Sequence, residues 1–183
     1  RAGPAAHPLS LPATTKPAIA TAANMRILVI NPNTCLEMTE GIGVAARAAA
    51  SQGTEIEAVS PDFGPETVEC HYDEAHSAVA VLDVIRKAES TNKYDGYVIA
   101  CFGDPALYAA RELTRAPVIG IAEAAFHVAA LIAPHFTVVT TLARMVTGLE
   151  HLLAQYGLAN RCRRIRAIDL PVAALEDKAE AGA

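Results

Sequence analysis

Apolar segments of strand length alternate with segments of helical pattern from residue 25 onward. The first of them, 26–30 (RILVI), is continuously apolar after Arg26, as in strands of a parallel sheet that is covered on both faces. The strict alternation predicts an α/β fold with a parallel, doubly wound sheet. Strands are expected at 26–30, 55–60, 94–100, 118–122, 136–142 and 164–170, and helices at 34–52, 72–91, 105–113, 123–133 and 145–156.

Two of the expected helices have a specific start signal. Thr34 is followed three residues later by Glu37, the spacing of a capping box, so a helix is expected directly after the first strand. Asp104 and Pro105 suit the N-cap and first helical position of the short helix at 105–113. Cys101 therefore falls between the end of a strand and the predicted start of a helix.

The two ends of the chain differ from the alternating part. Residues 1–24 are rich in Ala, Pro and Thr, contain no acidic residue and lack a continuous apolar core of signal-peptide length. We expect them to form a flexible leader before a domain at 25–183. After Pro171 a helix-forming stretch follows without another strand, so the chain either closes on a short helix or stops partway through a larger unit.

Composition and charge exclude several classes of protein. The chain has 183 residues, of which 52% are hydrophobic and 19% charged, so whole-chain disorder is excluded. Its formal net charge of -5 gives no basic surface for nucleic acid, and no apolar run approaches the ~20 residues of a membrane helix. The four cysteines are too widely spaced for a disulfide framework or a zinc site, which favours free thiols in the cytoplasm; they are Cys35, Cys70, Cys101 and Cys162.

Chemistry is expected in three loops that follow strands, because ligands of open parallel sheets bind beyond the carboxyl ends of the strands. Asn31 and Asn33 offer side-chain amides beside a helix start, although the same residues also suit an ordinary turn. Thr140 and Thr141 offer hydroxyls, although β-branched residues are also common at strand ends.

The third loop contains Cys101, Phe102, Gly103 and Asp104. A thiol beside a helix N-terminus has a lowered pKa, so Cys101 is expected to be the most reactive thiol of the chain. Gly103 would let a substrate approach the backbone closely. The alternative is an inert cysteine that is buried at the end of an apolar strand.

Common cofactor and nucleophile motifs are absent. The sequence contains no G-x-G-x-x-G after its first strand, no G-x-x-x-x-G-K-S/T and no G-x-S-x-G. These absences remove the usual grounds for a dinucleotide enzyme, a P-loop NTPase or an α/β-hydrolase. A cysteine enzyme that needs no cofactor remains.

Five segments of the chain carry a family resemblance: MRILVINPNT (25–34), GPETVECHYDEA (64–75), VIACFGDPAL (98–107), APVIGIAEAA (116–125) and FTVVTTLAR (136–144). Together they resemble the hydantoin racemases, including allantoin racemases, of the aspartate/glutamate racemase superfamily. The resemblance implies two facing α/β lobes, each with one catalytic cysteine, and cofactor-independent racemisation of a 5-substituted hydantoin or allantoin. It implies that Cys101 is the first-lobe catalytic cysteine and that Asn31, Gly103, Thr140 and Thr141 line the pocket. With Asn33 and Asp104 from the same loops, these are the expected substrate-binding residues.

The chain departs from this family in one important respect. The second cysteine of the family lies in a Gly-Cys-Ala-Gly-like loop after a later strand, and none of Cys35, Cys70 and Cys162 matches it. We therefore expect a C-terminally truncated member with an incomplete second lobe, whose exposed apolar surface favours a homo-oligomer. The alternatives are a single-cysteine relative of the arylmalonate decarboxylase or maleate isomerase type, or a non-catalytic ligand-binding or vestigial protein.

Overall fold

The computed structural model describes residues 24–91 and 93–175, so the predicted leader up to residue 23 and residues 176–183 lie outside the described part. Within it, all six expected strands and five expected helices are present, and every paired strand is parallel. The strands are β1 (Met25–Ile30), β2 (Thr54–Val59), β3 (Gly96–Ile99), β4 (Val118–Gly120), β5 (Phe136–Thr140) and β6 (Cys162–Ala167). The helices are α1 (Leu36–Ala49), α2 (His71–Glu89), α3 (Leu107–Leu113), α4 (Ile121–Ile132) and α5 (Val146–Gln155), with 3-10 turns η1 (Ala143–Met145) and η2 (Val172–Leu175).

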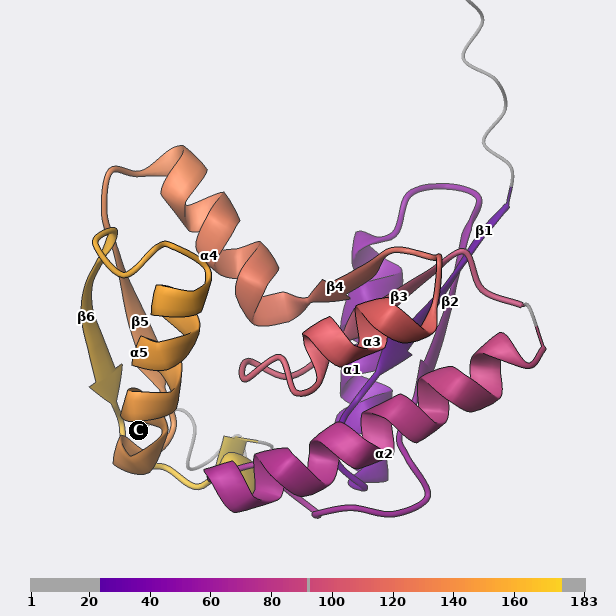
Figure 1. Ribbon diagram of the computed structural model, residues 1–183, viewed down its shortest axis with the longest axis horizontal. Helices are drawn as coiled ribbons and strands as arrows, with labels where there is room; N and C mark the ends of the chain where they lie inside the picture. Colours follow the sequence, from indigo (N-terminus) through magenta and orange to yellow (C-terminus); the bar gives the residue numbers. More distant parts are fainter. Residues whose placement is uncertain (1–23, 92, 176–183) are drawn as a thin grey trace, which may run out of the picture.

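The strands are divided between two sheets, one in each of two lobes. The first sheet has the order β2-β1-β3-β4, and β5 pairs with β6 in the second. Figure 1 shows α4 running from the first sheet to the second lobe, where α5 packs beside β5 and β6. The α/β fold is confirmed, and the two lobes that the resemblance implies are both present.

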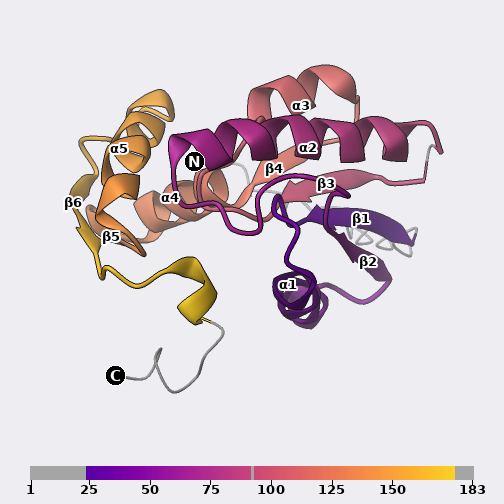
Figure 2. The ribbon, with the colours of Figure 1, turned by 90° about the horizontal axis from the view of Figure 1, so that it is seen from below.

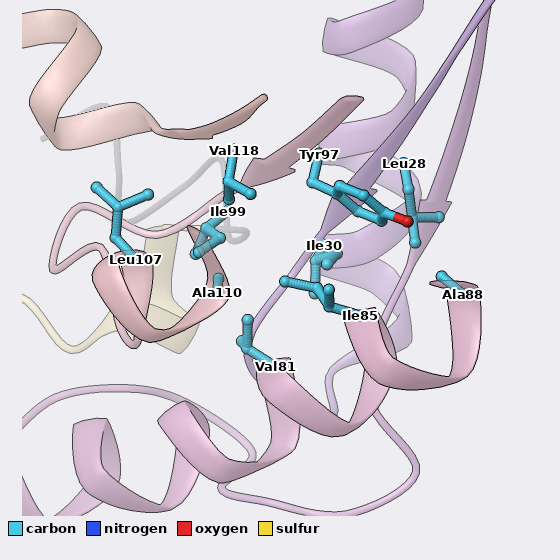
Figure 3. Close-up of a cluster of buried hydrophobic side chains, with 10 residues drawn as sticks. All are labelled: Leu28, Ile30, Val81, Ile85, Ala88, Tyr97, Ile99, Leu107, Ala110 and Val118. Carbon is cyan, nitrogen blue, oxygen red and sulfur yellow. The ribbon is translucent and has the colours of Figure 1, made fainter. Parts of the chain in front are cut away.

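Helices cover both faces of the first sheet. Figure 2 shows α2 and α3 on one face and α1 on the other. Because side chains alternate along a strand, Leu28 and Ile30 point into the core under α2 and α3, whereas Val29 points toward α1. Figure 3 shows this core, in which Ile85 of α2 and Tyr97 of β3 are also buried. Each such side chain contributes about 1.5–3 kcal/mol by leaving water.

Aromatic packing at α4 connects the first lobe to the second. Phe126 of α4 is buried and meets Phe102, in the loop after β3, edge to face with ring centroids 5.2 Å apart. It also stacks on Phe136 at the start of β5, with ring centroids 5.9 Å apart. The two lobes are therefore packed against each other through α4.

Two predicted helix starts are wrong. Helix α1 begins at Leu36 with Cys35 as its N-cap, and the Thr34 hydroxyl donates to the carbonyl of Pro65 instead of capping the helix. Helix α3 begins at Leu107, and Asp104 does not cap it. In both places a tertiary contact outweighs the local signal. No helix among the described residues is long and apolar enough to cross a membrane.

Candidate active site

A cavity of about 370 Å³ lies where the two lobes meet, beyond the carboxyl ends of β1, β3 and β5. The chain leaves β1 for β2 on one side and returns to β3 on the other, and this change of direction opens a crevice at the strand ends. Polar lining comes from Asn31, Asn33, Cys101, Gly103, Thr140 and Thr141, and apolar lining from Pro32, Met38, Val68, Ala100, Phe102, Ile121, Val139, Met145, Leu149, Ile168, Val172 and Leu175.

Asn31 holds the loop after β1 in place. Its side chain is almost fully buried, and Nδ2 donates to Oδ1 of Asn33 at 2.7 Å and to Oγ1 of Thr39 at 2.9 Å. The Cys35 carbonyl lies 3.2 Å from the same nitrogen. Because these partners belong to the loop and to α1, the amide of Asn31 fixes the cavity wall.

Asn33 has a donor to offer to a ligand. Its Oδ1 accepts from Asn31 and from the backbone N–H of Cys35, at 3.0 Å. Among the described residues, the partner of Asn33 Nδ2 is the sulfur of Met38 at 3.6 Å, which is a weak acceptor. The Nδ2 group can therefore donate to a carbonyl oxygen in the cavity.

Cys101 is a protonated thiol at neutral pH. Burial of its sulfur raises its pKa to about 11; the nearby backbone N–H of Gly103 opposes this rise, and the carboxylates of Glu74 and Asp104 add to it. The expectation of a lowered pKa is therefore wrong. The physical reason is that burial of the sulfur outweighs any effect of α3, which begins only at Leu107.

Gly103 allows a close approach beside the thiol. A Cβ atom at this position would lie 3.0 Å from Oε1 of Glu74 and 4.0 Å from Sγ of Cys101. A larger residue would therefore press on the Glu74 carboxylate and cover part of the sulfur. Glycine leaves this part of the cavity wall open.

The second lobe contributes two hydroxyls. The carbonyls of Thr140 and Thr141 accept the backbone N–H groups of Ile168 and Leu170, at 3.1 and 3.3 Å. Within the described ranges, neither hydroxyl has a hydrogen-bond partner from the protein. Both hydroxyls can therefore form hydrogen bonds with a ligand that also contacts Cys101 of the first lobe.

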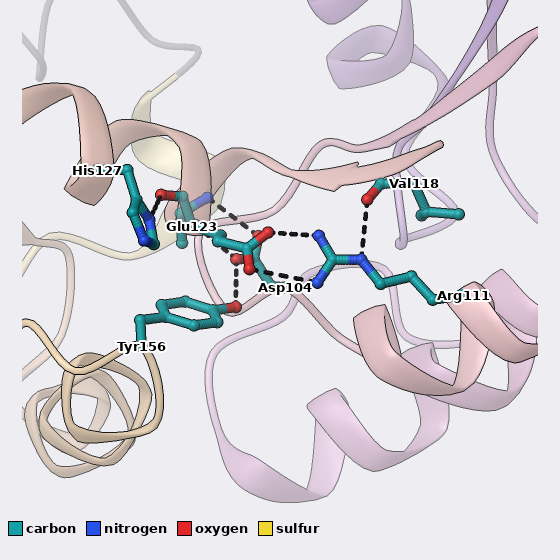
Figure 4. Close-up of polar contacts among 7 residues, drawn as sticks. Asp104, Arg111, Val118, Glu123, His127 and Tyr156 are labelled. Atoms are coloured by element: carbon teal, nitrogen blue, oxygen red, sulfur yellow. Dashed lines mark hydrogen bonds and ion pairs between the residues drawn. The ribbon is translucent and has the colours of Figure 1, made fainter. Parts of the chain in front are cut away.

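Asp104 is the predicted site residue that does not line the cavity. Its carboxylate points instead toward the start of α4 and the end of α5, as Figure 4 shows. The structure therefore brings together Cys101, both asparagines, Gly103 and both threonines, and it places the Asp104 side chain behind the cavity wall.

A family model described as Asp/Glu/Hydantoin racemase matches residues 27–183. The chain belongs to this family. It is 48% identical over 158 residues to a hydantoin racemase of Pseudomonas sp. (strain NS671), covering 86% of this chain and 63% of that protein. It is 42% identical to a hydantoin racemase of Paenarthrobacter aurescens, covering 84% of this chain and 65% of the relative.

Solved structures of two family members have the same fold. An allantoin racemase from Klebsiella pneumoniae superposes with a TM-score of 0.83 at 56% identity, covering 86% of this chain and 64% of that one. The allantoin racemase of Pseudomonas fluorescens gives 0.81 at 39% identity, covering 86% and 66%. The racemase-like two-lobe fold is confirmed, and this chain spans somewhat less than two thirds of its curated relatives.

Only one thiol of this racemase-family chain lines the cavity. All four cysteines are described; Cys35 and Cys70 are the N-cap residues of α1 and α2, and Cys162 begins β6.

Sequence reasoning missed most of the apolar lining of the cavity. Met145 could have been found because it follows the loop after β5 closely, whereas Val172 and Leu175 are brought to the cavity only by the turn after β6.

Proposed function

We propose that this chain forms the substrate cavity and supplies one acid/base residue, Cys101, of a cofactor-independent racemase for 5-substituted hydantoins or allantoin. One observation carries the proposal: among the described residues, the Cys101 thiol is the one titratable group that lines the cavity. Uncharged hydrogen-bonding groups surround it, and these suit the carbonyl and N–H groups of a neutral hydantoin ring.

The chemistry follows from the position of the reacting carbon next to a carbonyl. The thiolate form of Cys101, which is a small fraction at neutral pH because burial raises the pKa of this thiol, removes the C5 proton and becomes a thiol. The electron pair moves onto the carbonyl oxygen as an enolate. The Nδ2 group of Asn33 and the hydroxyls of Thr140 and Thr141 are the donors that stabilise this oxygen. Return of a proton from the same thiol restores the same enantiomer, so inversion needs an acid on the opposite face.

The named relatives support this choice of reaction. The curated proteins cited above are hydantoin racemases, and the superposed structures are allantoin racemases. The apolar lining from Met38, Val68 and Leu149 suits the 5-substituent of a hydantoin.

The cellular setting is part of the same proposal. The four cysteines are free thiols, which favours a reducing compartment such as the cytoplasm.

A homo-oligomer is supported by α4, where Val128, Leu131 and Ile132 are 55%, 85% and 82% exposed. A monomeric mass in solution by light scattering would contradict this part of the proposal.

Ligand protection of Cys101 tests the site directly. We expect a 5-substituted hydantoin at millimolar concentration to slow the alkylation of Cys101 about tenfold, because a bound ring covers the sulfur. Mass spectrometry after iodoacetamide treatment at pH 9.5 measures each cysteine separately. Cys162, which lies outside the cavity, is the internal control; equal loss of Cys101 with and without ligand would show that no hydantoin binds here.

A further inference from the structure

The two lobes meet at a polar junction centred on the Asp104 carboxylate (Figure 4). This side chain is only 5% exposed, and its oxygens accept the backbone N–H groups of Ala122 at 3.0 Å and Glu123 at 2.7 Å. The hydroxyl of Tyr156, at the end of α5, donates to the same carboxylate at 2.7 Å. Asp104 therefore caps α4 and binds the second lobe with one side chain.

The Asp104 carboxylate reaches its position through an unusual backbone conformation and lies very close to Gly120. Asp104 has a φ of 47°, in the left-handed region that residues with a Cβ rarely adopt. A Cβ at Gly120 would lie 2.3 Å from the Asp104 carboxylate. The strained backbone and the glycine opposite it together let the carboxylate reach the first turn of α4.

An ion pair keeps that first turn in place. Arg111 of α3 binds the carboxylate of Glu123 through both terminal nitrogens, and its Nε donates to the carbonyl of Val118 at 3.1 Å. Because Glu123 supplies one of the N–H groups that Asp104 accepts, this pair holds the capped turn of α4 against the first lobe.

Asp104 also closes the turn that carries the Cys101 thiol. The backbone N–H of Asp104 donates to the carbonyl of Cys101 at 3.1 Å, so residues 101–104 form a tight turn. The helix that ends near Tyr156 also contributes Leu149 to the cavity. A displacement of Asp104 would therefore move the Cys101 sulfur relative to the second lobe.

We propose that Asp104 is a positioning residue, whose carboxylate fixes the Cys101 turn against the second lobe through α4 and Tyr156. The importance of this placement for catalysis rests on the proposed function, in which Cys101 is the group that transfers the proton. The placement itself depends only on the contacts described above.

The alkylation rate of Cys101 measures this placement without requiring racemase activity. We compare the parent chain with Asp104→Asn, Tyr156→Phe and, as a control for general destabilisation, Ile85→Val in the core under α2. We expect Asp104→Asn to raise the rate about tenfold and Tyr156→Phe about threefold, because each loosens the turn and opens access to the sulfur. Ile85→Val should stay within about twofold of the parent.

Each variant separates one explanation from another. Tyr156→Phe keeps the charge of Asp104, so a faster reaction in that variant reports position rather than charge, and it remains informative if Asp104→Asn does not fold. Unchanged rates in both site variants, or an equal increase in Ile85→Val, would overturn the proposal. If the site variants react faster but replacing the matching cysteine in a full-length relative leaves racemisation intact, the proposed function fails while the placement by Asp104 stands.

Discussion

The 183-residue chain is expected to bind an optically pure 5-substituted hydantoin without inverting it at an enzymatic rate. Inversion requires removal of the C5 proton on one face and delivery on the other, and Cys101 is the one acid/base group in the described cavity wall. Because a positioned general acid contributes about 10²- to 10⁴-fold, inversion should be about 10²- to 10⁴-fold slower than in a full-length relative. Chiral chromatography of the substrate over time measures both proteins.

A Cys101→Ser variant is the matched control for this measurement. If the chain inverts its substrate as fast as the full-length relative and Cys101→Ser abolishes the reaction, a second acid/base group acts within these residues. Cys35 is then the first to test, because its backbone lies against the Asn31 loop. A Cys35→Ser variant would decide whether that thiol supplies the proton.

Alkylation of Cys101 is expected to be slow at neutral pH and to keep increasing up to about pH 11. Burial raises the pKa of this thiol to about 11, whereas an unperturbed cysteine has a pKa near 8.5. The protonated form therefore dominates at pH 7, and the thiolate fraction is about two orders of magnitude smaller than for an exposed thiol. Mass spectrometry across pH 6 to 11 gives the rate at each cysteine.

The shape of that profile separates the two accounts of the thiol. A raised pKa gives a rate that increases about tenfold per pH unit and shows no plateau below pH 10. A plateau below pH 9 would instead restore the activated thiolate that the sequence alone predicts. Glutathione in the same tube is the reference for an exposed thiol.

Secondary structure could be predicted because its signals are local. The run 27–30 is apolar throughout since β1 lies between α1 on one face and α2 and α3 on the other. The three loops of the site were also predictable, because parallel strands bring their carboxyl ends to one edge. The division of the strands between two sheets has no local signal; the family resemblance supplied it.

Asp104 shows where local reasoning fails. Its neighbour Pro105 indicates a helix start, but the groups that its carboxylate caps belong to α4 and are 18 and 19 residues away. The prediction of a lowered pKa for Cys101 is wrong for the same reason. Burial raises this pKa, and burial is a property of the whole fold that outweighs what a short motif suggests. Both errors concern contacts between elements that are far apart in the sequence, and a short motif carries no information about such contacts.

Hydrogen exchange at C5 tests most directly whether Cys101 transfers a proton to and from a hydantoin. Each pure enantiomer is incubated with the chain in D₂O at pH 9, and NMR follows deuterium at C5 while chiral chromatography follows configuration. Because the thiol reaches one face of the bound ring, we predict exchange above background for one enantiomer only, with retention, and its loss in Cys101→Ser. Equal exchange of both enantiomers, or exchange unchanged in Cys101→Ser, would contradict the proposed role of Cys101.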